Sequence, residues 1–125
     1  MLADKDAIGM IAVKDLAAAA RFYGEVLGLE KLESPEEEVL IYRSGASKIN
    51  VYRSEYAGTN KATCVMWNVG SELETIAARL KAKDVVFEHY DMPGLTRDGD
   101  IHSGGQMKVA WFRDAEGNIL SIGSG

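Results

Sequence analysis

The sequence predicts an α+β fold built from two pseudo-symmetric βαβββ modules. A strand, a helix and three further strands follow one another twice along the 125 residues. The first strands of the two halves align at an offset of 56 residues, and the last two strands align at offsets of 70 and 71. One half is too small to close a core alone, so the halves are expected to pair. Eight strands around two helices argue against a ferredoxin-like dimer, which has four strands in two βαβ units.

The first half begins with a short apolar run, residues 7–13, which is bounded by charges and predicts a strand. Asp15 is placed to cap a helix that extends to about Leu27. Gly28 is placed to end this helix in a left-handed conformation. Three short strands are then expected, at about residues 29–33, 37–43 and 47–53.

The second half begins with a predicted strand at residues 62–69. Ser71 and Glu74 have the spacing of a capping box at the start of a helix. Residues 114–117 predict a turn, and residues 91–106 predict a long irregular loop because they are rich in glycine and contain Pro93. Three strands complete this half, near residues 85–90, 107–113 and 118–123.

The composition is that of a folded protein, with 46% hydrophobic and 26% charged residues. The single cysteine, Cys64, excludes an intrachain disulfide. No apolar run approaches the roughly 20 residues that span a bilayer. The first residues lack the basic and apolar regions of a signal peptide, so a cytoplasmic location is expected. A net charge of −5 disfavours nucleic acid and anionic membranes as partners.

Two segments together resemble one protein family. Residues 13–16, VKDL, are followed by residues 20–29, ARFYGEVLGL, and residues 109–120 are VAWFRDAEGNIL. This combination resembles the vicinal oxygen chelate superfamily, which includes glyoxalase I, bleomycin resistance proteins and extradiol dioxygenases. The resemblance implies a single domain over residues 1–125, with modules at about 6–55 and 61–125. It also implies curled mixed sheets around a concave pocket, with each helix on the convex side.

The metal-dependent members of this superfamily hold a divalent ion with four inward His, Glu or Gln side chains. The resemblance places these four positions at Ile8, Asn50, Cys64 and Ser121. Ile8 cannot bind a metal, and a lone thiol with an amide and a hydroxyl makes a poor divalent site. Moving the alignment by one residue in either direction places no His, Glu or Gln at any of the four positions. The sequence therefore predicts no metal site and no other cofactor, which removes the chemistry of glyoxalase I and of the extradiol dioxygenases.

Three hypotheses about function remain. The leading hypothesis is a metal-free small-molecule-binding protein whose ligand the sequence does not identify. The alternative is a metal-free enzyme, of the isomerase or lyase type, that uses side-chain acids and bases. The third is an oligomerising or regulatory module with a vestigial pocket.

A homodimer is expected, because curled sheets leave strand edges to protect and twofold dimers are the commonest oligomers. Whether the modules pair within one chain or between two chains stays open.

Strand alternation assigns residues to two faces of the predicted sheets. One face is uniformly apolar, as helix packing requires: Ile11, Val13, Ile49, Val51, Val65, Trp67, Val69, Leu120 and Ile122. The other face mixes apolar and polar side chains, as small-molecule pockets do. Its members are Ile8, Met10, Ala12, Lys48, Asn50, Tyr52, Cys64, Met66, Asn68, Ile119 and Ser121.

The binding hypothesis draws on this mixed face. Asn50, Tyr52 and Ser121 are assigned as polar contacts, and Cys64 also lines the pocket. Met10, Met66 and Trp111 are assigned as apolar walls, although Trp111 and Phe112 alternate and the sequence leaves open which of them faces the pocket. His102 is expected at the pocket rim, in the long loop, where it could serve as an acid or base. His89 has a weaker case for that role, and Cys64 lacks a neighbouring histidine that would activate it as a nucleophile.

Overall fold

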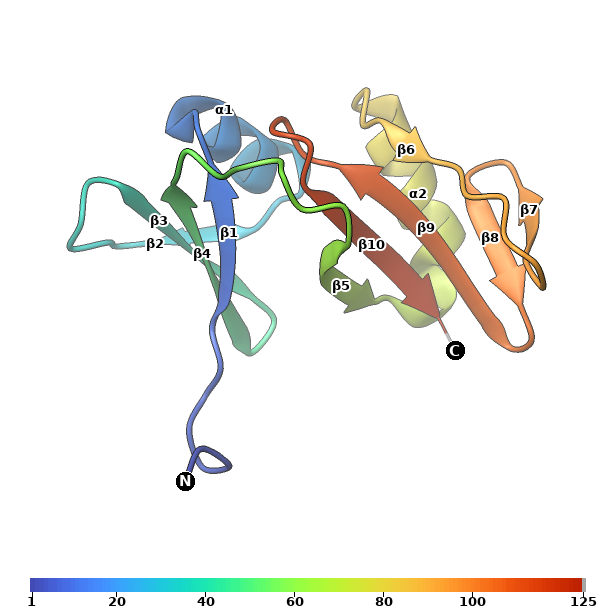
Figure 1. Ribbon diagram of the computed structural model, residues 1–125, viewed down its shortest axis with the longest axis horizontal. Helices are drawn as coiled ribbons and strands as arrows, with labels where there is room; N and C mark the ends of the chain where they lie inside the picture. Colours follow the sequence, from blue (N-terminus) through green and yellow to red (C-terminus); the bar gives the residue numbers. More distant parts are fainter. Residues whose placement is uncertain (125) are drawn as a thin grey trace. The chain divides into compact units, whose positions relative to one another are not determined.

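The chain forms two compact units, Met1–Ala57 and Gly58–Gly125, in a computed structural model that describes residues 1–124 (Figure 1). Each unit contains one mixed sheet and one principal helix. The α+β class and the two-module organisation are therefore confirmed.

The first unit is a four-stranded sheet with the order β1-β4-β3-β2. β1 runs parallel to β4, and the remaining pairs are antiparallel. The elements of this unit are β1 (Gly9–Val13), α1 (Leu16–Ala20), η1 (Arg21–Val26), β2 (Glu30–Leu32), β3 (Val39–Ser44) and β4 (Ser47–Arg53).

The predicted helix of the first unit begins and ends where the sequence indicates. Asp15 accepts a hydrogen bond from the backbone N–H of Ala18 at 3.0 Å, which caps the helix. The α-helical turns of α1 continue without a break into η1, which is a π-helix. Gly28 ends it with a φ of +74°, the left-handed conformation expected of a C-terminal glycine.

The second unit repeats this topology with additional strands. Within residues 1–124 its sheet has the order β5-β10-β9-β8-β7, and β6 also pairs with β9; β5 and β10 are parallel and the other pairs are antiparallel. The elements are β5 (Thr63–Asn68), η2 (Gly70–Glu72), α2 (Leu73–Ala82), β6 (Phe87–Glu88), β7 (Thr96–Asp98), β8 (Ile101–Gly104), β9 (Met107–Arg113) and β10 (Ile119–Ser124). The order β5-β10-β9-β8 matches β1-β4-β3-β2, which is the duplication inferred from the sequence offsets.

The expectation of an irregular loop at residues 91–106 is wrong in part. This segment contains the antiparallel hairpin of β7 and β8, followed by the turn into β9. Gly99 and Gly105 have φ values of +63° and +60° and occupy the tight turns at the two ends of β8. The glycines that suggested a loop therefore serve as hairpin turns, where a left-handed backbone is required.

The predicted capping box at Ser71 and Glu74 is also wrong. Residues Gly70–Glu72 form a 3₁₀ turn, so α2 begins only at Leu73, and no side chain of the described residues caps it. Asn68 instead accepts a hydrogen bond from the N–H of Gly70 at 3.2 Å. This contact lies in the turn between β5 and η2, and the helix that follows has Glu72 at its N-cap position.

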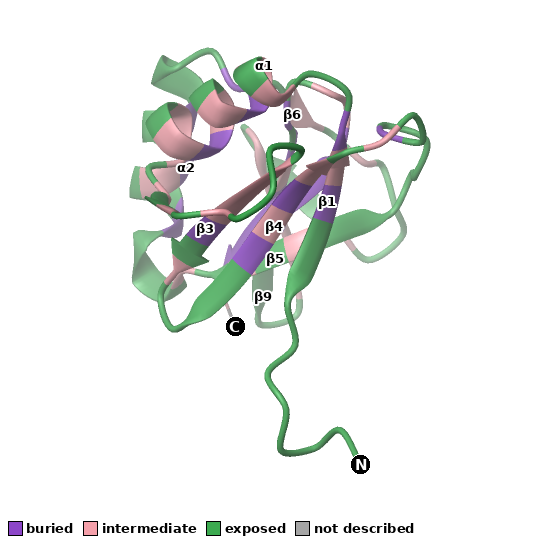
Figure 2. Ribbon diagram, turned by 90° about the vertical axis from the view of Figure 1, so that its left-hand side faces the viewer, coloured by how far each residue is buried: buried purple, intermediate pink, exposed green. Residues whose placement is uncertain are grey.

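The core of each unit lies on the face of the sheet that the sequence predicts to be apolar. In the first unit Ile11, Val13, Ile49 and Val51 are at most 5% exposed, and β1 changes from exposed to buried along its length (Figure 2). In the second unit Leu120 and Ile122 are buried in the same way. No helix within residues 1–124 is long and apolar enough to cross a membrane.

A buried aspartate organises the turn between β9 and β10. Asp114 is 7% exposed, and its Oδ1 accepts hydrogen bonds from the N–H groups of Glu116 and Asn118 at 2.8 and 2.9 Å. Its Oδ2 accepts a third from the side-chain amide of Asn118 at 2.8 Å. Gly117 completes the turn with a φ of +89°. The turn predicted at residues 114–117 is thus confirmed, and it fixes the pairing of Arg113 with Ile119.

Asp114→Ala is expected to lower the free energy of unfolding by about 3 kcal/mol, because it leaves buried N–H donors without their charged acceptor. Asp114→Asn keeps an acceptor oxygen and should lose less. Urea unfolding followed by circular dichroism measures both losses. Asp91→Ala, at an exposed position, is the control and should stay within about 0.5 kcal/mol. Equal stability of Asp114→Ala and the unchanged protein would contradict the assigned role of the turn.

Candidate functional site

The register between β9 and β10 decides which aromatic residue lies on the mixed face. Trp111 pairs with Ser121, whereas Phe112 pairs with Leu120. Phe112 is 1% exposed and contacts the ring of Phe87, so it belongs to the core. Trp111 is half-buried and shares its face with Ser121. Trp111, and not Phe112, therefore lies on the mixed face of the sheet.

Three rings gather on the mixed face of the second unit. Trp111 meets Tyr90 edge to face, with ring centroids 4.9 Å apart, and meets His102 in the same manner at 4.8 Å. The Tyr90 and His102 rings lie 6.2 Å apart. These separations are those of favourable aromatic contacts. We refer to Tyr90, His102 and Trp111 as the aromatic cluster.

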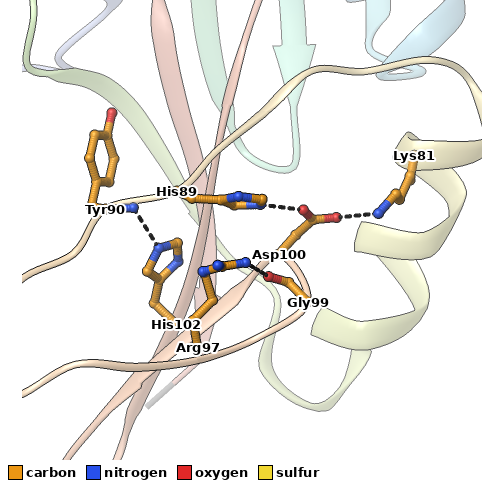
Figure 3. Close-up of polar contacts among 7 residues, drawn as sticks. All are labelled: Lys81, His89, Tyr90, Arg97, Gly99, Asp100 and His102. Atoms are coloured by element: carbon orange, nitrogen blue, oxygen red, sulfur yellow. Dashed lines mark hydrogen bonds and ion pairs between the residues drawn. The ribbon is translucent and has the colours of Figure 1, made fainter.

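The aromatic cluster forms because two short strands pair with β9. β8 pairs with its first half through His102 and Val109, and β6 pairs further along through Glu88 and Trp111. Tyr90, just beyond β6, therefore lies next to His102. The backbone N–H of Tyr90 donates a hydrogen bond to Nε2 of His102 at 2.9 Å (Figure 3).

His102 does not lie in a loop at a pocket rim, as the sequence suggested. It is a residue of β8 and is 0% exposed. Its Nδ1 is buried and, within residues 1–124, has no hydrogen-bond partner. Because a backbone N–H can only donate, Nε2 must accept and carries no proton. The proton of the neutral ring is therefore assigned to Nδ1 from the hydrogen-bond pattern.

The other predicted residues of the second unit differ in exposure. Ser121 is 3% exposed, whereas Met66, its partner on β5, is 58% exposed. Cys64 lies where the pairing of β5 and β10 shifts register, and it is exposed. Partial desolvation of the thiol, together with the negative charge of Asp114, raises the pKa of Cys64. A raised pKa keeps the thiol protonated near neutral pH, which disfavours Cys64 as a nucleophile.

An ion pair borders the aromatic cluster. Nε and Nη2 of Arg113 each lie 2.6 Å from Oε1 of Glu88. Glu88 is the pairing partner of Trp111, so this ion pair lies beside the indole. The guanidinium charge is therefore neutralised by a protein carboxylate.

The predicted residues of the first unit share one face of its sheet. Met10 pairs with Asn50, and Ala12 pairs with Tyr52. Met10 is 55% exposed, and Asn50 and Tyr52 are half-buried. A hollow of about 250 Å³ at the end of this face is lined by Asp6, Ala7, Ile8, Ala46, Ser47 and Lys48. A second hollow, of about 790 Å³, lies at the β2–β3 end and includes none of the predicted site residues.

The four positions implied for metal ligands do not suit a divalent ion. Ile8 carries no donor atom, and Asn50 and Ser121 offer only a neutral amide and a hydroxyl. The raised pKa of Cys64 disfavours the thiolate that a metal would require. Within residues 1–124, no three His, Cys, Asp or Glu side chains gather in a way that could hold a metal ion.

A second polar network lies next to the aromatic cluster (Figure 3). Nε2 of His89 is 2.7 Å from Oδ1 of Asp100, and Nζ of Lys81 is 3.2 Å from Oδ2. Burial alone raises the pKa of Asp100, but the hydrogen bonds from His89 and Lys81 outweigh it and hold that pKa below its usual value. The network ties α2 to the β7–β8 turn and to the segment that carries Tyr90.

Sequence reasoning missed Tyr90, Glu88 and Arg113 as neighbours of the mixed face. Strand alternation could have placed Glu88 and Tyr90 on one face, since a strand was expected at residues 85–90. It could not show that β6 and β8 share the same edge of β9, which is the arrangement that joins Tyr90 to His102.

Comparison with known proteins identifies the fold. No protein-family model and no curated protein matches the sequence. Among solved structures, the fosfomycin resistance protein FosX from Listeria monocytogenes is similar with a TM-score of 0.74 and 16% identity, over 100% of this chain and 95% of that chain. Lactoylglutathione lyase from Agrobacterium tumefaciens is similar with a TM-score of 0.72 and 17% identity, over 100% of this chain and 96% of that chain. TnmS3, an antibiotic binding protein from Streptomyces sp. CB03234, gives a TM-score of 0.69 and 16% identity, over 99% and 98%.

The chain therefore has the fold of the vicinal oxygen chelate superfamily, as the sequence resemblance implied. Its structural neighbours include a lyase and an antibiotic binding protein, so the fold does not decide between these functions.

Asp100→Asn is expected to weaken the pH dependence of stability. A carboxyl whose pKa is lower in the folded than in the unfolded protein stabilises the fold above its unfolded pKa, near 3.9, and this stabilisation is lost as the pH falls. The variant should lose about 1 kcal/mol of unfolding free energy at pH 7 and less at pH 3. Urea unfolding at both pH values measures this difference. Asp98→Asn, exposed on the same hairpin, is the matched control. If Asp100→Asn lowers the free energy of unfolding by the same amount at pH 7 and at pH 3, the assigned role of Asp100 is wrong.

Proposed function

We propose that this chain is a metal-free small-molecule-binding protein of the glyoxalase, bleomycin resistance and dioxygenase superfamily. The observation that carries the proposal is the aromatic cluster on the mixed face of the second unit, with half-buried Trp111 between Tyr90 and His102. An indole bordered by a few polar groups is suited to hold a small, partly apolar molecule.

The hydrogen bond to His102 and the pKa of Cys64 support binding more than catalysis. A base inside the site would need a free acceptor nitrogen, but Nε2 of His102 is occupied by the N–H of Tyr90. The raised pKa of Cys64 disfavours a thiolate nucleophile. The antibiotic-binding neighbour TnmS3 agrees with a binding role. Ser121 and Met66 are proposed to contact the ligand from β10 and β5.

The mixed face of the first unit is proposed to bind ligand as well. Met10 supplies apolar surface there, and Asn50 and Tyr52 supply hydrogen-bonding groups.

A metal-free isomerase or lyase is the second candidate. The contact that favours it is the short approach of His89 to Asp100, because a carboxylate that holds one imidazole nitrogen leaves the other available as a base. Recovery of the bound compound distinguishes the two candidates, since an enzyme returns a converted product.

A thermal-shift screen of small metabolites and planar antibiotics tests the proposal. At least one compound should stabilise the protein and be recovered unchanged. Trp111→Ala should weaken its binding about tenfold or more, because the aromatic anchor of the site is lost. Ser121→Ala, on the same face of the second unit, should weaken it less. Tyr56→Ala removes an aromatic residue that is 79% exposed and should leave affinity unchanged. If no compound stabilises the protein, or if Trp111→Ala binds a hit as tightly as before, the site assignment is wrong.

We also propose that the chain is a homodimer in solution. Large apolar side chains remain exposed on the mixed faces, including Ile8 at 49%, Met10 at 55% and Met66 at 58%. Exposed apolar surface of this kind marks interaction sites. Light scattering should give twice the chain mass of 13.6 kDa, and a value of 13.6 kDa at all concentrations would contradict the proposal.

A further inference from the structure

The hollow of about 250 Å³ in the first unit lies at the start of β1. The parallel pairing of β1 with β4 brings together the two segments that form it, which are the residues before β1 and the turn from β3 into β4. Its lining residues are Asp6, Ala7, Ile8, Ala46, Ser47 and Lys48, and all of them are exposed. A ligand can therefore enter this hollow directly from solvent.

Two opposite charges line the hollow without neutralising each other. Within residues 1–124, neither the carboxylate of Asp6 nor the ammonium group of Lys48 forms an ion pair or a side-chain hydrogen bond. Opposite charges that line one hollow and do not meet leave room for a molecule that contacts both of them.

The position of Lys48 in the sheet leaves its charge unmatched. Lys48 on β4 pairs with Arg43 on β3, so two cations lie opposite each other on one face of the sheet. Oε2 of Glu30 lies 3.0 Å from Nε of Arg43 and neutralises only that cation. Like charges directly opposite each other destabilise a sheet, so an anionic group bound at Lys48 relieves this repulsion.

The other polar groups of the hollow are hydrogen-bond acceptors. Oγ of Ser47 donates its proton to the backbone carbonyl of Ser44 at 2.7 Å, so only its lone pairs remain for a ligand. The ionised carboxylate of Asp6 also can only accept. A ligand group that meets both must donate hydrogen bonds, and a positive charge on it complements Asp6. Ile8, which is 49% exposed, adds apolar surface beside these groups.

We propose that this hollow binds a free α-amino acid with an apolar side chain. Lys48 holds the carboxylate of the amino acid, Asp6 and Ser47 hold its ammonium group, and Ile8 contacts its side chain. The volume of about 250 Å³ is just below the roughly 300 to 1,000 Å³ of pockets for drug-sized ligands, which suits so small a molecule. The site contains no residue of the aromatic cluster and goes beyond the function proposed for that cluster.

Three related compounds test the inference on the whole chain at pH 7. L-leucine carries both charged groups, 4-methylpentanoate is leucine without the ammonium group, and 3-methylbutylamine is leucine without the carboxylate. In ¹H–¹⁵N correlation spectra, leucine should move the backbone amide signals of residues 6–8 and 46–48. It should bind about fivefold or more tightly than either fragment, because each fragment loses one charged contact.

Two variants assign the charged contacts. Lys48→Met keeps the apolar stem and removes the charge, so the advantage of leucine over 3-methylbutylamine should disappear. Asp6→Asn removes the negative charge, so the advantage of leucine over 4-methylpentanoate should fall to about twofold or less. Lys61→Met, at an exposed position of the second unit, is the control and should keep both advantages.

The outcomes that overturn the inference are distinct from those that test the aromatic cluster. Leucine that leaves the signals of residues 6–8 and 46–48 unmoved, or that binds no more tightly than its fragments, shows that the hollow is not an amino-acid site. The same conclusion follows if both advantages persist in Lys48→Met and Asp6→Asn. None of these results changes the prediction for Trp111→Ala.

Discussion

The register between β9 and β10 is the constraint on which the candidate site depends. Side chains alternate along a strand, so a shift of one residue would exchange the two faces of β9. The turn at Asp114 prevents this shift, because its nearly buried carboxylate accepts hydrogen bonds from Glu116 and Asn118. It thereby directs Phe112 into the core and leaves Trp111 opposite Ser121. On the other edge of β9, β6 and β8 pair with it and place Tyr90 and His102 beside the indole.

Most of the fold could be predicted because the sequence patterns that determine its strands, helices and turns are local. The apolar alternation of residues such as Ile49 and Val51, the cap at Asp15 and the turn at Gly117 all depend on neighbours in sequence. The β7–β8 hairpin was missed because its strands are short and largely polar, so only its glycines were visible. The site was harder to predict, since the burial of His102 and its contact with Tyr90 depend on two separate strands meeting the same edge of β9.

The chemistry of the site follows from what surrounds each group. His102, which the sequence offers as an acid or base, has its acceptor nitrogen occupied and is left as a buried donor. Cys64 has a raised pKa, and Arg113 is neutralised by Glu88. Each of these interactions makes a reactive or charged group of the site unavailable. What remains is the aromatic surface of the rings and one buried hydrogen-bond donor. That combination supports the proposed binding function.

The central claim of the proposed function is that the four positions Ile8, Asn50, Cys64 and Ser121 hold no metal ion. Elemental analysis of protein purified without chelators and dialysed against Zn²⁺, Ni²⁺, Fe²⁺ and Mn²⁺ in turn, followed by metal-free buffer, tests this claim most directly. The account predicts no stoichiometric metal after the final dialysis. One equivalent of a retained divalent ion that is lost in Cys64→Ala or Ser121→Ala would contradict it.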